Sequence, residues 1–402
     1  MLATLAGAAI TVAAEPRTEP PLALTGARIY PDPDGLPIFD GTVVVGGGKI
    51  LAVGPRDKVT IPAGAATLDC AGKVIVAGFQ NSHVHFSEEK WADAAHQPAD
   101  KLAAQLEAML TRWGYTTVVD TGSLLENTVA LRRRIEAGEV AGPRILTAGL
   151  PIYPPHGIPF YLKDTLPPAI LALLPTPETP ELAVAVVQRN LAGGGDITKL
   201  FTGSWIAHGK VLPLPDAIAV AAAAEAHRQG KLVFSHPSNV AGLEVAMHAH
   251  VDVLAHALDD TRGLTAEHYR RMKEQNMAMV PTLKLFSGGR WSFDIGDEVR
   301  TFARAGGQIL FGTDVGYLTD YDPAPEFELM GTAGLGWRKI LASLTTNPAA
   351  RFGESARRGT LVAGADADLV VLGSDPANSL RAFTDVRRVL RGGRVVYSTP
   401  AP

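Results

Sequence analysis

The 402-residue sequence contains one cysteine, Cys70. A single thiol excludes an intramolecular disulfide and a zinc site built from several thiolates. An excess of one charge is also missing, because 37 Lys and Arg stand against 41 Asp and Glu, which gives a net charge of −4. This balance, with no long basic run, argues against binding to nucleic acid or to an anionic membrane. We therefore expect a small, neutral-to-polar molecule as the partner.

The sequence also has no apolar run long enough to span a membrane. Residues 2–14 are apolar and mostly small, but they are too few to cross a bilayer. They resemble the apolar core and cleavage site of a signal peptide, although no basic residue precedes them. We interpret residues 1–21 as a signal peptide or an N-terminal extension. A signal peptide would make the protein periplasmic or secreted, and an extension would leave it in the cytoplasm.

Short strands are expected at both ends of the chain. With 46% hydrophobic residues and a mean hydropathy of +0.10, the protein should have a large core. Strand patterns in residues 22–72 cover Leu22–Tyr30, Gly41–Val45, Lys49–Val53 and Ala66–Asp69. In residues 354–402 they cover Asp368–Leu372, Val386–Arg391 and Arg394–Tyr397. Neither group has enough strands for a good core of its own. We predict that the two termini pair into one small β-sandwich domain.

Residues 73–353 alternate short apolar strands with longer helical segments. The strands end near His85, Asp120, Gly149, Phe201, His236, His256, Leu283 and Asp314. The helical segments include Ala99–Trp113, Glu126–Gly138, Pro180–Leu191 and Pro215–Gln229. Eight such units predict the α/β class and a (β/α)8 TIM barrel. An open doubly wound sheet is the alternative, but no glycine-rich phosphate-binding pattern follows the first strand.

Polar residues collect at the carboxyl ends of these strands, where TIM barrels place their active sites. His83 and His85 lie one residue apart on a strand, so both imidazoles point to the same face and can bind one metal ion. Further candidate ligands end four other strands: Lys199, His236, His256 and Asp314. Each alone is more simply a structural residue, such as a helix cap for Asp314. Together, at one rim, they predict a metal site.

Position separates the remaining histidines. His248 and His250 repeat the His-x-His pattern, but they fall at a helix end near the opposite face of the barrel. We expect them, with His227 and His268, to be structural. His96, His156 and His208 lie in loops on the active face. Of these, His156 and His208 are the better candidates for substrate contact.

The sequence resembles the amidohydrolase superfamily, in its binuclear, carboxylated-lysine subtype. Besides the ordered ligands, four segments carry the resemblance: residues 78–85 (GFQNSHVH), 114–118 (GYTTV), 346–349 (TNPA) and 364–372 (GADADLVVL). They are similar to the family's first-strand, second-strand and two closing motifs. The likeness covers nearly the whole chain after residue 22. Prolidase-like and ochratoxin-hydrolysing members are the most similar in kind.

The resemblance implies a role for each ligand. His83, His85 and Asp314 would hold the more buried of two divalent ions, and His236 and His256 the more exposed one. Lys199 would be carboxylated at its Nζ atom and would bridge both ions. Zinc suits a site rich in imidazole, with manganese, iron, cobalt and nickel as alternatives.

The resemblance also implies hydrolysis of a small amide, in which a hydroxide bridging the metals attacks the carbonyl carbon. Asp314 would take the proton and pass it to the leaving group. His156 and Tyr161, in the loop of residues 153–161, are candidates to stabilise the developing oxyanion, with Tyr317 as a weaker one. Simple loop packing is the alternative for His156 and Tyr161.

Other activities stay open. Lactones, carbamates and phosphotriesters suit the same kind of site. A mononuclear deaminase of the superfamily usually has Glu three residues after the strand-five histidine, where this chain has Asn239, and lacks Lys199. A metal-free scaffold would have lost ligands that are all present here. Many peptide-cleaving members carry Gly-Gly after the bridging lysine, and residues 202–205 (TGSW) depart from that pattern. The sequence leaves open whether the protein is a homo-oligomer.

Overall fold

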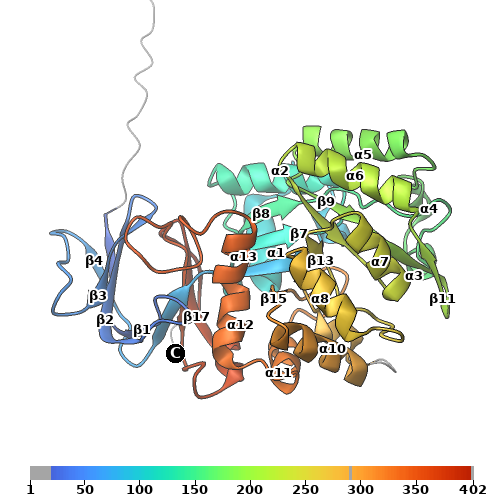
Figure 1. The fold of residues 1–402 in the computed structure, drawn as a ribbon. Coiled ribbons are helices and arrows are strands. Elements are labelled where there is room, and N and C mark those ends of the chain that lie inside the picture. Colours follow the sequence, from blue (N-terminus) through green and yellow to red (C-terminus); the bar gives the residue numbers. More distant parts are fainter. Residues whose placement is uncertain (1–19, 289–291, 400–402) are drawn as a thin grey trace, which may run out of the picture.

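A computed structural model describes residues 20–288 and 292–399, without side-chain detail for 292–294. The predicted signal peptide falls on residues outside this part, apart from its last two positions. Figure 1 shows a β sheet built from both ends of the chain, lying beside a larger α/β unit. Among the described residues, no helix has the length and apolar character needed to cross a membrane.

Strands from both termini form the first sheet. In spatial order they are β18 (Arg394–Ser398), β17 (Val386–Arg391), β16 (Leu369–Leu372), β5 (Val74–Ala77), β1 (Leu22–Ile29), β2 (Ile38–Gly46) and β3 (Lys49–Pro55), and β4 (Ala66–Asp69) also pairs with β1. The predicted strands are therefore found and do pair across the termini. They form one continuous sheet, however, and not the two hydrogen-bonded sheets expected of a sandwich.

The shape of β1 explains this difference. Its residues 22–25 pair with β4, whereas Arg28 and Ile29 pair with β5 on the same side. Gly26, between the two halves, has a φ of +82°, which only glycine adopts readily. The strand can therefore change partner midway and join the N-terminal and C-terminal strands into a single sheet. That sheet encloses its own apolar cluster, which includes Leu24, Ile75 and Leu369.

Eight parallel strands make up the second unit. One sheet contains β6 (Phe79–Val84), β7 (Tyr115–Asp120) and β8 (Arg144–Thr147), and the other contains β9 (Ile197–Leu200), β12 (Leu232–Ser235), β13 (Val253–Leu254), β14 (Ala278–Met279) and β15 (Gln308–Ile309). Isolated bridges join the two sheets at both edges, through Ile152 with Leu200 and Val84 with Val315. The arrangement is a TIM-barrel-like α/β fold.

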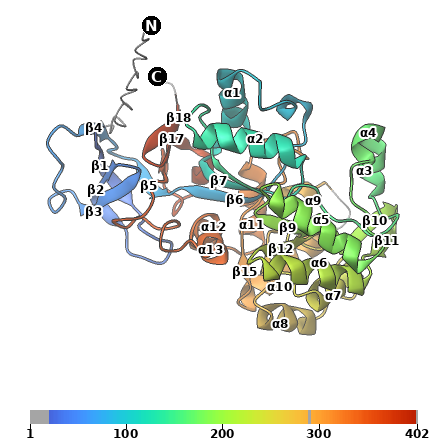
Figure 2. The same cartoon turned by 90° about the horizontal axis from the view of Figure 1, so that it is seen from above.

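Helices follow the strands along the chain. The structure contains α1 (Ala99–Met109), α2 (Leu125–Glu136), α3 (Phe160–Thr165), α4 (Pro168–Leu171), α5 (Pro180–Ala192), α6 (Asp216–Arg228), α7 (Val240–His248), α8 (Ala266–Glu274), α9 (Leu283–Phe286), α10 (Ser292–Arg304), α11 (Ala324–Thr332), α12 (Trp337–Leu344) and α13 (Thr346–Arg351). Short 3₁₀ turns cover Glu89–Trp91, Thr111–Trp113 and Leu380–Thr384. Seen from above, α3, α4 and the hairpin of β10 (Gly203–Ala207) and β11 (Lys210–Pro213) lie far from the terminal sheet (Figure 2).

Two predicted boundaries change. The seventh parallel strand ends at Met279 and not near Leu283, because Thr282 has a left-handed backbone (φ 48°) and α9 begins at Leu283. Pro215 precedes helix α6 at its N-cap, one residue before the first turn. Gly230 follows that helix with a φ of +68°, the conformation that ends many helices. The β10–β11 hairpin was not predicted.

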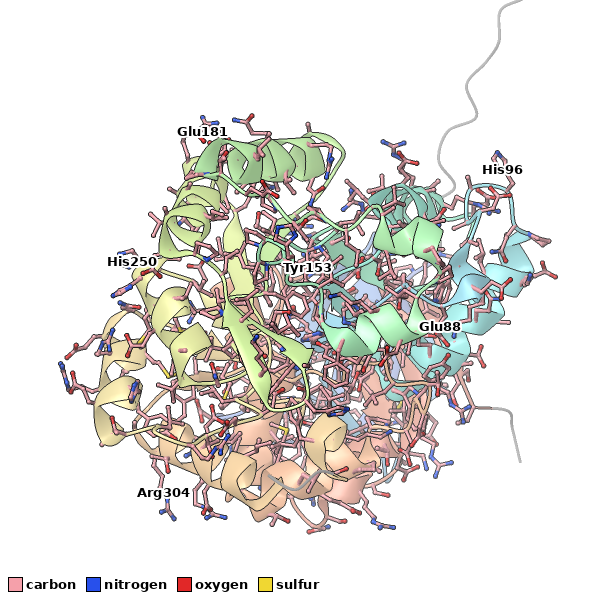
Figure 3. The ribbon with its side chains drawn as sticks, turned by 90° about the vertical axis from the view of Figure 1, so that its right-hand side faces the viewer. Glu88, His96, Tyr153, Glu181, His250 and Arg304 are labelled. Carbon is pink, nitrogen blue, oxygen red and sulfur yellow. The ribbon has the colours of Figure 1, made fainter. Side chains whose placement is uncertain are left out.

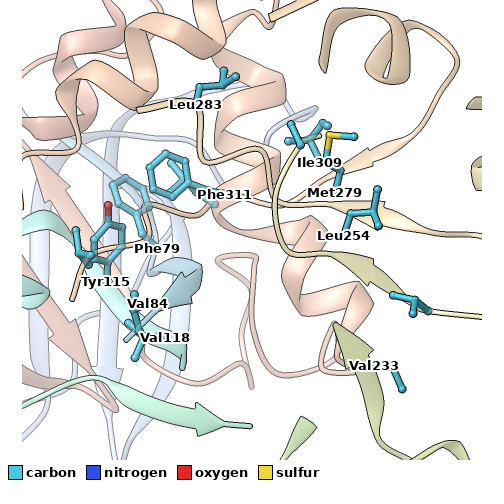
Figure 4. Close-up of a cluster of buried hydrophobic side chains, with 14 of the residues drawn as sticks. Phe79, Val84, Tyr115, Val118, Val233, Leu254, Met279, Leu283, Ile309 and Phe311 are labelled. Carbon is cyan, nitrogen blue, oxygen red and sulfur yellow. The ribbon is translucent and has the colours of Figure 1, made fainter. Parts of the chain in front are cut away.

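Large aromatic side chains fill the space beneath the carboxyl end of β6. Phe311, two residues after Ile309 ends β15, is fully buried. Its ring stacks on Phe327 with centroids 4.7 Å apart and lies 6.1 Å from the ring of Tyr115. Figure 4 shows Phe311 beside Phe79 and Tyr115. The Phe311 carbonyl also accepts a hydrogen bond from Ser82 N, which ties this cluster to the His-x-His strand.

Replacing Phe311 with Ala should lower the free energy of unfolding by about 3–5 kcal/mol, because the change removes a buried ring and leaves a cavity. Urea denaturation measures this loss. Phe39→Ala is the matched control, since Phe39 is 63% exposed, and it should change the stability little. Equal losses in the two variants would contradict the packing role of Phe311.

Candidate metal centre

The six predicted ligands all occupy the carboxyl ends of parallel strands. His83 and Lys199 lie within β6 and β9, His236 directly follows β12, and His256, Asp314 and His85 lie in the segments after β13, β15 and β6. Five of them are buried, and the sixth, His85, has an 18% exposed side chain. The strand order therefore brings together residues that are up to 231 positions apart in the chain.

Three of the histidine rings are held through their Nδ1 atoms. His83 Nδ1 lies 2.5 Å from the carbonyl oxygen of Ala255, and His85 Nδ1 lies 2.7 Å from that of Gly122. His256 Nδ1 lies 2.7 Å from Thr282 Oγ1, whose own hydrogen is donated to the carbonyl oxygen of Pro281. A carbonyl only accepts, so Nδ1 carries the proton in each ring. Each Nε2 is then left with a lone pair, the state in which imidazole binds metals.

These lone pairs converge on Asp314. Its Oδ1 atom lies 3.2 Å from His83 Nε2 and 2.9 Å from His85 Nε2, and the two Nε2 atoms are 3.3 Å apart. Acceptors this close repel one another unless a positive charge lies among them. Ligand atoms of His83, His256 and Asp314 also lie within 4.8 Å of one another. The donor set therefore fits a divalent cation.

His236 supplies a further unpaired atom. Its buried Nε2 has no hydrogen-bond partner among the described residues, and the same is true of Asp314 Oδ1. The ring of His236 stacks on Phe201, with centroids 4.7 Å apart and planes 14° apart, and lies 4.6 Å from the ring of His256. Buried polar atoms are rarely left unpaired, and a metal ion accounts for both of these.

The electrostatics of the site keep His83, His236 and His256 in the ligating form, whereas the hydrogen bond to Asp314 and the charge of that carboxylate outweigh burial and raise the pKa of His85. Burial lowers the pKa of His83 to about 4 and holds the pKa values of His236 and His256 well below 6.5. Burial opposes the charge of Asp314, but His83 and His85 outweigh it and keep the pKa of that carboxyl well below its usual range. Metal binding needs neutral imidazole and ionised carboxylate, and both are present at neutral pH.

Lys199 is the sixth member of the cluster. Its side chain is buried, and its Nζ atom lies 5.5 Å from the centre of the Phe201 ring. Burial lowers the pKa of Lys199 to about 7, because the ammonium is poorly solvated there. A large share of the lysine is thus the neutral amine, which can react with carbon dioxide.

The ligands expected for the more buried ion and those expected for the more exposed ion do not differ in this way in the exposure of their side chains. His85, assigned to the more buried ion, is the most exposed of the ligands, whereas His236 and His256 are 6% and 4% exposed. The tightest group, His83, His256 and Asp314, also takes members from both halves. The reason is that the ring of His256 lies close to that of His83, with centroids 4.4 Å apart and planes tilted by 42°.

The loop residues predicted to contact the substrate differ in their exposure and in their neighbours. The side chain of His156 is 88% exposed and its nearest charged partner is Glu178, at 3.7 Å, so the structure does not bring it to the metal cluster. Its left-handed backbone, with a φ of 56°, turns the side chain outward. His208 packs on the ring of Phe160 at 4.4 Å. Tyr161, in α3, contacts Tyr317, which follows Asp314.

The remaining histidines lie away from the site. Figure 3 shows His96 and His250 at the outer edge of the molecule, whereas Tyr153 lies near its centre. His248 and His227 pair with Asp216 and Asp252, respectively. His268 belongs to a capping box with Thr265 at the start of α8. The structural roles expected for these residues match their positions.

Two residues that position the candidate ligands were not predicted from the sequence. Asp120, the last residue of β7, is buried and accepts hydrogen bonds from Gly122 N, Ser123 Oγ and Thr147 Oγ1. It thereby holds the turn whose Gly122 carbonyl orients His85. A carboxylate at the end of a parallel strand is a signal that sequence analysis could have used. Thr282, which orients His256, carries no such signal because it follows a strand by three residues.

Comparison with known proteins agrees with this geometry. Residues 74–396 match the model of the amidohydrolase family. The chain belongs to the amidohydrolase family. A putative prolidase from Bifidobacterium longum is 27% identical, with a TM-score of 0.78 over 94% of each chain. The A. niger ochratoxinase is 20% identical, with a TM-score of 0.77 over 96% of this chain and 97% of its own, and shows the fold alone. The family supports a hydrolase.

A deaminase also shows a short likeness. The 5-methylthioadenosine/S-adenosylhomocysteine deaminase of Symbiobacterium thermophilum is 32% identical over 65 residues, which cover 16% of this amidohydrolase and only 15% of the deaminase. At the position where a deaminase would carry its glutamate, Asn239 caps helix α7 by accepting a hydrogen bond from Gly242 N at 3.1 Å. Asn239 therefore has a structural role here.

Thr282→Val should weaken metal binding roughly 10-fold to 100-fold, because His256 loses the acceptor that fixes its ring. Valine is β-branched like threonine, so the left-handed backbone at position 282 is equally strained in the wild type and in Thr282→Val. Metal titration with a competing chelator measures the affinity. Thr282→Ser should retain it, and Thr60→Val, which alters an exposed threonine, is the control. Unchanged affinity in Thr282→Val would contradict the role.

Proposed function

We propose that this amidohydrolase uses two divalent metal ions, with zinc the best fit, to cleave an amide bond of a small molecule. One observation carries the proposal. Asp314 Oδ1 and His236 Nε2 are buried without a partner in the described chain, Asp314 Oδ1 lies within 3.2 Å of the Nε2 atoms of His83 and His85, and a buried lysine of lowered pKa ends a strand at the same rim. Such a set is stable only around cations.

Each ligand has a role in this proposal. Asp314 and the four histidines would hold the ions, and Lys199, once carboxylated on Nζ, would add two oxygen ligands. The carboxylated form is an anion, so it removes the mismatch between an ammonium and a metal ion. When bound, the ions supply a hydroxide at neutral pH and polarise the scissile carbonyl. Imidazole-rich ligation favours zinc, with manganese, iron, cobalt and nickel as alternatives.

Asp314 is placed to transfer the proton. Its carboxylate is ionised at neutral pH, and its left-handed backbone (φ 57°) is held by a 2.9 Å hydrogen bond from its N–H to the carbonyl of His83. The attacking oxygen forms a bond to the carbonyl carbon, and Asp314 takes its proton. The C–N bond then breaks as Asp314 returns this proton to the leaving nitrogen, so a carboxylate and an amine are released.

Tyr161 is the better candidate for stabilising the oxyanion. Burial raises its pKa well above 10, and the negative charges of Asp259 and Asp314 raise it further. The phenol therefore keeps its proton at neutral pH and can donate a hydrogen bond to a developing negative charge. The contact of its ring with that of Tyr317, three residues after Asp314, supports a position near the ligands. The exposed His156 has no comparable position.

Lys199→Ala should abolish hydrolysis and reduce bound metal below the about two ions per chain expected for a binuclear site. Elemental analysis gives the metal content, and N-acyl amino acids, dipeptides, lactones and phosphotriesters give a substrate panel. Lys210→Ala, which changes an exposed lysine on β11, should retain both properties. A carbamate signal in ¹³C NMR after growth with ¹³C-bicarbonate should appear only where Lys199 is present. Full activity in Lys199→Ala would refute the bridging role.

Tyr161→Phe should lower kcat roughly 100-fold to 1000-fold with a smaller change in KM, because the lost hydrogen bond forms in the transition state. Steady-state kinetics on the best substrate of the panel measures the effect. His156→Ala should stay near the wild-type value, since that side chain is exposed. The opposite ranking of the two variants would move the oxyanion role to His156.

A further inference from the structure

Asp259 is a carboxylate that the proposed reaction does not use. It lies three residues after His256, in the loop that follows β13. Its Oδ2 atom accepts a hydrogen bond from Trp205 Nε1, which comes from β10, and its Oδ1 atom is buried with no hydrogen-bond partner in the described chain. A buried carboxylate oxygen without a donor costs free energy, so it calls for a partner from outside the chain.

The surroundings of Asp259 make this partner positive. Glu298, also buried, lies on the other side of Leu258, whose N–H it accepts at 2.9 Å, and the charge of Asp259 raises the pKa of Glu298. The next acid, Asp260, is already paired with Arg262. No lysine, arginine or histidine of the described residues forms an ion pair with Asp259, and burial raises its pKa to about 7.

Asp259 also follows β13 at the carboxyl end of that strand, the end at which the candidate ligands lie. Its charge and that of Asp314 both act on the phenol of Tyr161, and the ring of Tyr161 lies 6.0 Å from that of Tyr317. Trp205 fixes the carboxylate through the hydrogen bond from its indole N–H. Aromatic faces and a carboxylate are the groups with which proteins bind organic cations.

We propose that Asp259 binds a positively charged group of the substrate, an ammonium or a guanidinium, beside the scissile amide. That the bound cation belongs to a substrate rests on the proposed amide hydrolysis. Binding of the cation at Asp259 does not depend on catalysis. Asp259 acts as a specificity-determining residue, and the free Oδ1 atom accepts the hydrogen bond from the cationic nitrogen. The preferred substrates are then cationic amides and not N-acyl amino acids that carry only a carboxylate.

Binding of a matched probe pair tests the subsite without any turnover. Benzylammonium and benzyl alcohol have the same ring and differ in charge. At pH 8, metal-reconstituted protein should bind benzylammonium at least about tenfold more tightly than benzyl alcohol, as expected for one charged hydrogen bond. Asp259→Asn should remove this preference. Asp260→Asn is the control, because that carboxylate is already paired with Arg262, and it should retain the preference.

Hydrolysis separates this inference from the proposed function. The p-nitroanilides of N-acetyl-lysine and N-acetyl-norleucine differ by the ammonium, and the ratio of their kcat/KM values should fall toward one in Asp259→Asn. Equal binding of both probes by the wild type, with hydrolysis of both anilides, would overturn the cation subsite alone. An Asp259-dependent probe preference without hydrolysis of any amide would refute the amide function alone.

A second variant tests the subsite if Asp259→Asn does not fold. Trp205→Phe removes the donor to Asp259 Oδ2 and should reduce the preference for benzylammonium several-fold. An unchanged preference would overturn the subsite.

Discussion

Electrostatic repulsion among buried lone pairs determines how this site is organised. His83, His85 and Asp314 direct acceptor atoms toward one another at 2.9–3.3 Å, and a hydrogen bond at the far nitrogen of each ring prevents these histidines from relieving the repulsion by a tautomer change. Only a positive charge at the centre stabilises such an arrangement. The rest of the fold can be understood as the frame that keeps these atoms together.

Backbone strain around the ligands is part of that frame. Asp314 and Thr282 adopt left-handed conformations that side chains rarely take. Close contact makes glycine necessary at position 316, where a Cβ atom would lie 1.9 Å from the carbonyl oxygen of His85. Strained backbone of this kind persists only where the surrounding packing holds it, and it is common at functional sites. Here the aromatic cluster around Phe311 provides that packing.

Substrate recognition is built on different elements from the metal site. The ligands come from the strands and the residues just after them, whereas Tyr161, Trp205 and Asp259 come from α3, the β10–β11 hairpin and the loop after β13. A rigid sheet therefore supports the chemistry, and the longer connections can vary to select the substrate. The proposed cation subsite at Asp259 would give this chain a preference that its small net charge of −4 does not reveal.

The sequence by itself determined the order of strands and the ligands at their ends. That was possible because a His-x-His pair on a strand must share one face, and because parallel strands bring their carboxyl ends to one rim. Tertiary structure alone decided which loop side chains face that rim. His156 turns outward, and Asp259 meets Trp205 across 54 positions of sequence. The single terminal sheet was likewise decided by the change of partner at Gly26. Contacts between distant segments have no periodic pattern in the sequence, because they depend on how packed elements place each loop.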